Sequence, residues 1–330
     1  MNSFICRYLL LLAFMLGGTL QAGLAQNSAY ESILRARGLV EGQPYESVRF
    51  AASSSTELSV VTATGNIEIF GNPRIDYVQI DLYVKEGFSF WSGGSNVGNF
   101  RLIFQQQGDK LIATVEPKRG DSRVWQNDNI SFSYVVQVPT QLSSRIRSTR
   151  GDIYARNLNG THLLQVTAGN LFIDGLTGEI RAFSASGNIT ANDIWGDFNG
   201  KTTNGNITVQ KAEGEVRLRT VNGNLTAREI MGTFIAATTN GMVDAVLQSA
   251  GEGSYIETTN GGINLTLPPN PNYALDLSGS ALDLSDVLRS GRPFEGNLTH
   301  NSADIHFGDG SVPVQVSSLT GRITLQTSRD

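Results

Sequence analysis

The sequence has one cysteine, Cys6, and it lies within the first 26 residues. This segment contains Arg7, an apolar run over residues 8–16 and the small residues Gly23-Leu24-Ala25, a pattern that predicts a secretory signal peptide over residues 1–26. The mature chain would then have no thiol, no disulfide and no cysteine metal site. Cys6 also lies too early to be the lipid-modified cysteine of a lipoprotein, which would sit at the cleavage point.

Charge and long apolar runs are also scarce. Charged residues make up 17% of the chain, the net charge is −5, and no run of Lys or Arg occurs. The absence of a basic stripe argues against nucleic acid as a partner. No stretch after the predicted signal approaches the ~20 apolar residues of a membrane-spanning helix. We therefore expect an exported protein without a transmembrane segment in its mature chain, located in the periplasm, on the outer surface or outside the cell.

Glycine, in contrast, is abundant and periodic. The chain has 36 glycines. From residue 151 to residue 241 one falls every nine residues: Gly151, Gly160, Gly169, Gly178, Gly187, Gly196, Gly205, Gly214, Gly223, Gly232 and Gly241. The nonapeptides alternate in kind, as in T-N-G-N-I-T-V-Q-K followed by A-E-G-E-V-R-L-R-T over residues 203–220, so the full repeat has eighteen residues. A fixed repeat of this length indicates a solenoid of stacked coils.

Within each nonapeptide apolar residues alternate with polar ones, which is typical of a strand with one buried face. One apolar column reads Ile153, Leu171, Ile189, Ile207, Leu225 and Val243. Five residues of strand and four of turn, twice per repeat, describe a flattened coil with two parallel sheets. We therefore predict an all-β fold: a single-stranded parallel β-solenoid, similar to a β-helix or β-roll, with eighteen-residue coils and a sheet-rich N-terminal portion.

The same patterns predict the domain organisation. Residues 27–46 are expected to form a lead-in or cap that includes a short amphipathic helix, and residues 47–330 the solenoid domain. Strands are expected before the array at Tyr77–Val84, Phe100–Phe104, Lys110–Val115 and Ile130–Val138. Regular repeats should cover 149–267, followed by an irregular excursion over 270–310 and a last coil over 311–327.

Two kinds of residue recur beside the turns and are expected to be structural. Glycine supplies a positive φ or allows a close backbone approach, as expected for Gly151, Gly169, Gly187, Gly205, Gly223 and Gly241. Asparagine tolerates turn conformations, and stacked amides bond one another in ladders. The two expected asparagine ladders are Asn204, Asn222, Asn240 and Asn260, and Asn170, Asn188, Asn206 and Asn224. The sequons at Asn188, Asn206 and Asn224 follow from the repeat phrase, and they lie too close together for all to carry glycans.

Metal binding is weakly supported. Calcium-binding nonapeptide repeats also wind eighteen residues per coil, but they carry a regular Asp in each turn. Only Glu179, Asp197 and Glu215 form an acidic column here, and Arg181 and Arg217 lie beside it. A charge-balanced outer face is the simpler interpretation, so we expect no metal and no cofactor.

Catalytic residues are also not evident. A site in a β-helix enzyme needs acids, or acids with a metal and a base, that converge in a groove. His162, His300 and His306 are isolated in the sequence, and only the last two could approach an acid, Asp304. We therefore predict a protein that is not an enzyme. Two places are left as candidate ligand sites: the aromatic-rich loop over residues 88–125, which includes Trp91 and Trp125, and the excursion over residues 270–310. In the loop, closure of a sheet end by the aromatic rings is the simpler interpretation.

Several phrases together resemble the bacterial putative-adhesin family. They are T-A-T-G-N-I-E-I-F-G at 62–71, V-P-T at 138–140 with T-R-G-D-I-Y-A-R-N-L-N-G at 149–160, the T-N-G-N-I-T-V array, and T-T-N-G-G-I-N-L-T-L-P at 258–268. The resemblance covers roughly residues 47–327. It implies an exported β-solenoid with a role at the cell envelope or surface and no known catalytic residues, and it carries no ligand with it. We expect the partner to be an unknown surface or envelope ligand, a protein or a glycan. The alternatives are a carbohydrate-active β-helix enzyme and a periplasmic accessory to envelope-stress signalling.

Overall fold

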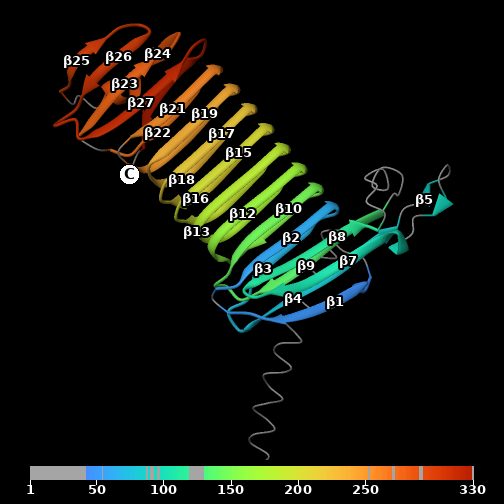
Figure 1. Ribbon diagram of the computed structural model, residues 1–330. Coiled ribbons are helices and arrows are strands. Elements are labelled where there is room, and N and C mark those ends of the chain that lie inside the picture. Colours follow the sequence, from blue (N-terminus) through green and yellow to red (C-terminus); the bar gives the residue numbers. More distant parts are fainter. Residues whose placement is uncertain are drawn as a thin grey trace, which may run out of the picture. The chain divides into compact units, whose positions relative to one another are not determined.

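Parallel strands that lie eighteen residues apart in the sequence pair with each other through most of the chain. The structure, a computed structural model, describes residues 42–53, 55–86, 97–118, 130–251, 253–269, 272–289 and 293–328, and the backbone of 88–89 and 93–94. Ile189 pairs with Ile207, and Phe198 pairs with Val216. The same register runs from β10 to β19, so each coil lies directly on the one before it (Figure 1).

The elements follow one another as short strands. Before the array they are β1 Glu46–Ala51, β2 Glu57–Thr64, β3 Ile67–Gly71, β4 Tyr77–Glu86, β5 Phe88–Ser89, β6 Gly93–Gly94, the 3-10 helix η1 Val97–Asn99, β7 Phe100–Gln107, β8 Lys110–Pro117 and β9 Ile130–Val138. The array comprises β10 Ser143–Arg150, β11 Ile153–Arg156, β12 Asn159–Ala168, β13 Leu171–Ser186, β14 Ile189–Trp195, β15 Phe198–Asn204, β16 Ile207–Glu213, β17 Val216–Asn222, β18 Leu225–Gly232, β19 Phe234–Asn240, β20 Val243–Ala250, β21 Ser254–Asn260 and β22 Ile263–Leu267. After it come β23 Tyr273–Ser278, β24 Ala281–Asp283, α3 Ser285–Leu288, β25 Glu295–Leu298, β26 Ser302–His306, β27 Val312–Ser318 and β28 Arg322–Thr327.

The strands form two faces of a flattened stack. Sheet 1 has the order β7–β8–β2–β10–β12–β13–β15–β17–β19–β21–β27–β23–β26–β25. Sheet 2 has the order β1–β4–β9–β3–β11–β13–β14–β16–β18–β20–β22–β28–β24. The long strand β13 turns the corner and belongs to both. The all-β prediction is therefore confirmed.

The core lies between the two sheets and is filled by the inward residues of every strand. In sheet 1 one inward column consists of His162, Ile180, Phe198, Val216 and Phe234, all buried. Gly200 of the neighbouring column leaves room for the ring of Phe198, because a Cβ there would lie 3.0 Å from the ring atom Cε1. Apolar area removed from water contributes about 25 cal/mol per Å², so this continuous core supplies most of the stability of a chain that lacks disulfides.

Both ends of the stack contain antiparallel strands, which corrects the expectation of a purely parallel solenoid. At one end β7 pairs antiparallel with β8, and β4 with β9 and β1. At the other end β26 pairs antiparallel with β23 and β25. A free edge of a parallel sheet is a template for another chain, and natural proteins cover such edges. Antiparallel hairpins give this cover here, and periodicity within the array contains no signal for them.

The last coil of the sequence is not the last coil of the stack. β27 and β28 pair with β21 and β22 on one side and with β23 and β24 on the other. The chain therefore leaves the stack after Leu267, forms the more distant strands first, and then returns to fill the position between them (Figure 1). Residues 270–310 were expected to be irregular, but their described part contains β23, β24, α3, β25 and β26.

The glycines of one corner lie on each other along the whole stack. A Cβ on Gly187 would collide with the carbonyl oxygen of Gly169, and one on Gly205 with that of Gly187. The same relation connects Gly65, Gly151, Gly169, Gly187, Gly205, Gly223, Gly241, Gly261 and Gly321, each with the glycine before it. The close approach of the next coil is therefore the requirement that these positions share. It includes Gly321, which follows Gly261 across the inserted excursion.

A column of buried hydroxyl groups beside these glycines was not foreseen from the sequence. The Thr202 hydroxyl donates a hydrogen bond of 3.0 Å to the carbonyl oxygen of Gly187, fifteen residues earlier. Ser148, Ser184, Thr220, Thr238, Thr258 and Ser318 each donate in the same way to the corner glycine of a neighbouring coil. Val166 occupies this column between Ser148 and Ser184 and has no hydroxyl. Each hydroxyl satisfies a carbonyl that the turn leaves available.

This column predicts opposite effects for two reciprocal substitutions. Thr202→Val should lower the free energy of unfolding by about 1 kcal/mol, because it removes a buried hydrogen bond without changing the side-chain volume. Val166→Thr should raise it by up to about 1 kcal/mol, since its hydroxyl would reach the carbonyl oxygen of Gly151. Denaturant unfolding of both variants measures the difference. Equal destabilisation by the two changes would contradict the role of the hydroxyl column.

Candidate functional site

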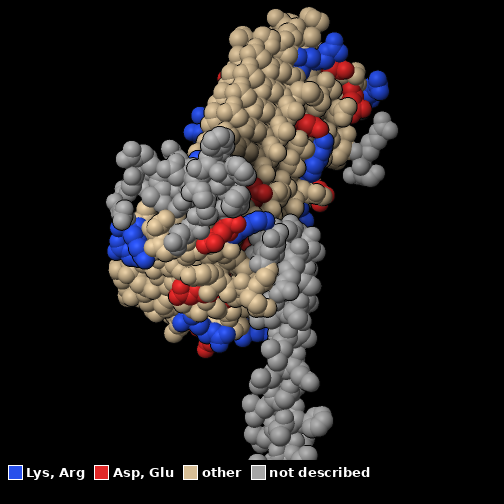
Figure 2. All heavy atoms as spheres, turned by 90° about the vertical axis from the view of Figure 1, so that its right-hand side faces the viewer, with Lys and Arg blue, Asp and Glu red and all other residues tan. Residues whose placement is uncertain are grey.

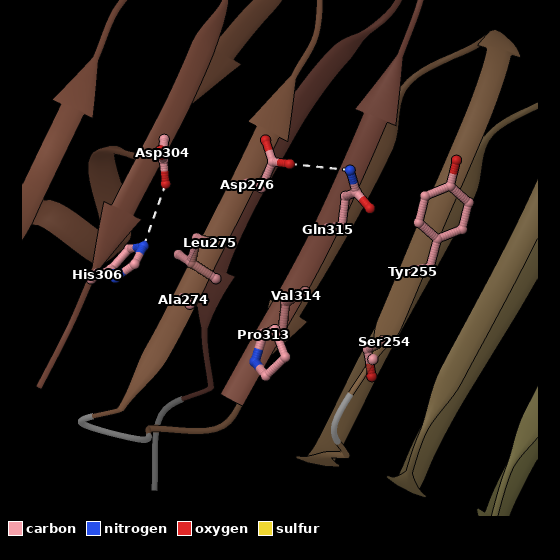
Figure 3. A pocket seen from close by; sticks show the side chains of 11 residues that line it. Ser254, Tyr255, Ala274, Leu275, Asp276, Asp304, His306, Pro313, Val314 and Gln315 are labelled. Carbon is pink, nitrogen blue, oxygen red and sulfur yellow. Dashed lines mark hydrogen bonds and ion pairs between the residues drawn. The ribbon is translucent and has the colours of Figure 1, made fainter. Parts of the chain in front are cut away.

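A hollow lies on the outer surface of sheet 1 at its C-terminal end, over β21, β27, β23 and β26. The cavity has a volume of about 270 Å³ and is open to solvent. Its lining residues are Gly253, Ser254, Tyr255, Ala274, Leu275, Asp276, Asp304, His306, Pro313, Val314 and Gln315. We call this cavity the groove. Two of these residues, Ala274 and Pro313, have small side chains. They are register partners on β23 and β27 and lie among the larger side chains of the groove (Figure 3).

The polar side chains of the groove come from four strands and stand in one row. Tyr255 pairs with Gln315, Gln315 with Asp276, and Asp276 with Asp304. Strand alternation points Asp276 outward, because its neighbours Leu275 and Leu277 are buried in the core. Four strands at ~4.8 Å spacing make this row roughly 14 Å long. Figure 3 shows Asp304, Asp276, Gln315 and Tyr255 side by side, with His306 beside Asp304.

Hydrogen bonds hold the row in place. The Gln315 amide Nε2 donates to Asp276 Oδ2 at 3.1 Å, and His306 Nε2 lies 3.4 Å from Asp304 Oδ1. The Tyr255 hydroxyl donates to Glu257 Oε2 at 2.8 Å. Partial burial, and then this bond to Glu257, raise the pKa of Tyr255 above its usual value. The phenol therefore keeps its proton at neutral pH.

The groove differs from the array in its charge balance. Several acids of the array are paired with a basic side chain: Glu179 with Arg181 at 2.5 Å, Asp193 with Lys211 at 2.7 Å, and Glu215 with Arg217. Among the described residues, no Lys or Arg nitrogen lies within 4.0 Å of a carboxylate oxygen of Asp276 or Asp304. Their partners are an amide and an imidazole instead. The groove therefore carries excess negative charge.

The three histidines lie in three different environments. His306 contacts Asp304 in the groove, as the sequence allowed, whereas the backbone oxygen of His300 accepts a bond from the Leu282 N–H. His162 is fully buried in the core column of sheet 1, where its Nδ1 lies 3.0 Å from Ser144 Oγ. Its burial lowers its pKa from the usual 6.5 to about 4.

The acidic column of the array lies on the outer face of sheet 1, as its register requires. Arg181, Asn199 and Arg217 are successive register partners, so the guanidinium groups of Arg181 and Arg217 stand beside their acids. Within the part of the chain that the structure describes, no group of three or more His, Cys, Asp or Glu residues is arranged to hold a metal ion.

The two asparagine columns bond in different ways. In the first, amides bond amides: Asn222 Nδ2 donates to Asn204 Oδ1 at 2.8 Å, and Asn240 and Asn260 continue the ladder. In the second, each Oδ1 accepts from the backbone N–H of the next coil, as Asn188 does from Asn206 at 2.8 Å. Asn170 and Asn224 take part in the same way. The corner that carries both columns forms a broad surface with few charged groups (Figure 2).

An exposed tryptophan marks the opposite corner, where the sequence suggested no site. Trp195 is 45% exposed, and Lys211 Nζ lies 5.7 Å from the centre of its ring. Lys211 and Asp193 both have positive φ values, near 56°, which non-glycine residues rarely adopt. Since the Lys211 ammonium is already paired with Asp193 at 2.7 Å, this corner presents balanced charges, unlike the groove.

Other predicted features lie outside the described residues. These are the signal peptide over residues 1–26, most of the lead-in over residues 27–46, and Trp91 and Trp125 of the aromatic-rich loop. Phe100 of that loop is buried against Phe132, with ring centres 5.0 Å apart in an edge-to-face arrangement. No helix among the described residues has the length and apolar character needed to cross a membrane.

No family model matches the chain, and no curated protein matches it. Three solved structures are similar to it at low identity. A putative cell adhesion protein from Clostridium sporogenes is 9% identical, with a TM-score of 0.21, over 86% of this chain and 99% of its own. A putative adhesin from Bacteroides fragilis is 12% identical, with a TM-score of 0.39, over 87% and 100%. A putative lipid binding protein from Parabacteroides distasonis is 11% identical, with a TM-score of 0.36, over 88% and 98%.

The resemblance to bacterial putative adhesins that the sequence indicates is therefore also found by structural comparison. It is a resemblance only. These identities and TM-scores are too low to transfer a fold detail, a ligand or a residue role from those proteins to this chain.

Proposed function

We propose that this chain is an exported, non-enzymatic binding protein of the bacterial envelope or surface, and that the groove is its ligand site. The observation that carries the proposal is the row of Tyr255, Gln315, Asp276 and Asp304 on a rigid sheet, around a cavity with small residues at its floor. Binding sites are concave and present a few placed polar groups. The predicted signal peptide supports export, and the names of the similar structures, two of adhesion proteins and one of a lipid-binding protein, leave the ligand open.

The corner glycines and asparagines have a supporting role in this proposal. Their partners are the glycines and asparagines of neighbouring coils, so they fix the spacing of the strands that carry the groove. A site on strands is held more precisely than one on loops, because strand pairing fixes the positions of the residues that carry its side chains. Metal and cofactor are not part of this function.

Filling the groove tests the proposal. Ala274→Tyr places a large side chain on the groove floor from an outward-facing position of β23, and it should reduce binding to a panel of immobilised bacterial and host glycans and peptides at least tenfold. Ala168→Tyr is the matched control, since Ala168 is an exposed residue of β12 in the same sheet, five strands away from β21. Equal binding by both variants would show that the ligand site lies elsewhere. Cell fractionation with surface protease treatment measures the location independently.

A second function, hydrolysis of a glycan, is favoured by one observation. Asp276 and Asp304 are direct partners on antiparallel strands. The Cβ atoms of such partners lie about 4.5–5.5 Å apart, which allows the two carboxyl groups to reach the separation of about 5–5.5 Å that retaining glycosidases have. Both side chains are exposed, however, whereas an acid catalyst needs apolar surroundings to keep its proton at neutral pH. Release of reducing ends from acidic polysaccharides, lost in Asp304→Asn, would establish this function instead.

A further inference from the structure

The charge of the groove indicates what kind of ligand it takes. Asp276 and Asp304 contribute two negative charges, and Glu257 adds a third at the Tyr255 hydroxyl. Asp276 lacks a basic neighbour of the kind that Glu179 and Glu215 have in the array, since its register partners are Gln315 and Asp304. Complementary charge steers and selects partners. A cationic group on the ligand would therefore take the place that Arg181 and Arg217 occupy beside the acids of the array.

Tyr255 adds a second, independent preference. It stands at the end of the polar row opposite to Asp304 (Figure 3). A tyrosine face attracts a cation and also buries the apolar face of a ring. Its hydroxyl is already used as a donor to Glu257, so the ring rather than the hydroxyl donor is available to the ligand. A ligand with both a cationic group and a compact ring can contact the acids at one end of the row and the Tyr255 ring at the other.

The backbone around the groove excludes one common mode of recognition. β21, β27, β23 and β26 are each paired on both sides, so no strand at the groove has a free edge. An extended peptide cannot add to the sheet there through its main chain. The ligand must therefore be recognised by side chains alone. This favours a small molecule that carries many hydrogen-bonding groups.

From these three observations we infer that the groove binds a saccharide that carries primary amines, with its ammonium groups at Asp276 and Asp304 and a sugar ring against Tyr255. This inference rests on the proposed function, because it specifies the ligand of the same groove. The cavity volume of about 270 Å³ suits one or two small rings rather than a large ligand.

The experiment compares two trisaccharides of the same backbone. One is β-1,4-linked glucosamine, which carries amines, and the other is its N-acetylated form, which carries none. Titration of the full chain by calorimetry or NMR at neutral pH and low salt should show at least tenfold tighter binding of the amine form. The double variant Asp276→Asn/Asp304→Asn should remove this difference. Asp197→Asn, an exposed acid on the outer face of the same sheet, should leave it unchanged.

The other outcomes separate the ligand class from the site. Equal binding of both trisaccharides, lost in Ala274→Tyr, would overturn the amine inference and leave the groove as the binding site. Binding of trilysine as tight as that of the glucosamine trimer would indicate a basic peptide and also overturn it. If the double variant keeps full affinity for the glucosamine trimer, or if neither trisaccharide binds, the inference is wrong. The glycan and peptide panel then decides separately whether the groove binds at all.

Discussion

Gly187→Ala is expected to disrupt the stack locally and lower its stability by more than about 3 kcal/mol. The new Cβ would collide with the carbonyl oxygen of Gly169, a backbone atom that no side-chain rotation can move away. The φ of Gly187 is 151°, which adds strain for any residue with a side chain. Relief requires that the coils of Gly169 and Gly187 separate, which breaks the bond from the Gly169 N–H to the Ser186 oxygen and the one from the Ser184 hydroxyl to the Gly169 oxygen.

Hydrogen exchange and thermal unfolding measure this effect. Since each coil of a solenoid contacts only its neighbours, protection should fall first in β12, β13 and β14, which flank Gly169 and Gly187, before the ends of the stack. Gly108→Ala is the control, because Gly108 also has a positive φ, 59°, yet a Cβ added there would meet no atom within 4 Å. The control should cost only about 1–2 kcal/mol of backbone strain. A similar loss in both variants would show that φ, and not coil contact, makes the glycines necessary.

The eighteen-residue register could be predicted because parallel stacking places identical repeat positions on one another. The residues that repeat are also those that meet, as Ile189 meets Ile207. The reason for the glycines was only half predictable. From the sequence, each glycine could be required either by a positive φ in a turn or by close contact with another backbone segment. The structure shows that the corner glycines share the second reason, contact with the backbone of the neighbouring coil. The left-handed column of Asn157, Gly175, Asp193, Lys211 and Glu229 contains a single glycine, so the glycine period does not mark it.

The strand pairing at the ends of the stack and in the groove could not be predicted, for one physical reason, although the sequence named residues 270–310, which supply part of the groove, as a candidate ligand site. Both depend on pairing between segments with no common repeat. Asp276 and Gln315 meet because β27 returns into the stack after β23 has formed beyond it. Tyr255 and Asp304 belong to the same row through that insertion. Of the groove contacts, only the approach of His306 to Asp304 was available from the sequence, because those residues lie two apart on one strand.

The second large effect is expected at acid pH and comes from His162. This side chain is fully buried in a column of Ile180, Phe198 and other apolar residues, and its burial lowers its pKa to about 4. The unfolded chain has the usual histidine pKa of ~6.5. Between these two values the unfolded state binds a proton that the native state does not, so stability is lost as the pH falls from 6.5 to 4. The total loss from this one group is about 3 kcal/mol.

His162→Leu should therefore flatten the pH dependence of stability. Denaturant unfolding at neutral pH and near pH ~4.5 should show a decrease for the native sequence that exceeds the decrease for the variant by about 2–3 kcal/mol. The carboxylates titrate alike in both proteins and cancel in this comparison. The variant also leaves the Ser144 hydroxyl without its imidazole partner, but that cost is the same at both pH values. Parallel curves for the two proteins would mean that His162 reaches water and protonates in the native state, which its position between the two sheets forbids.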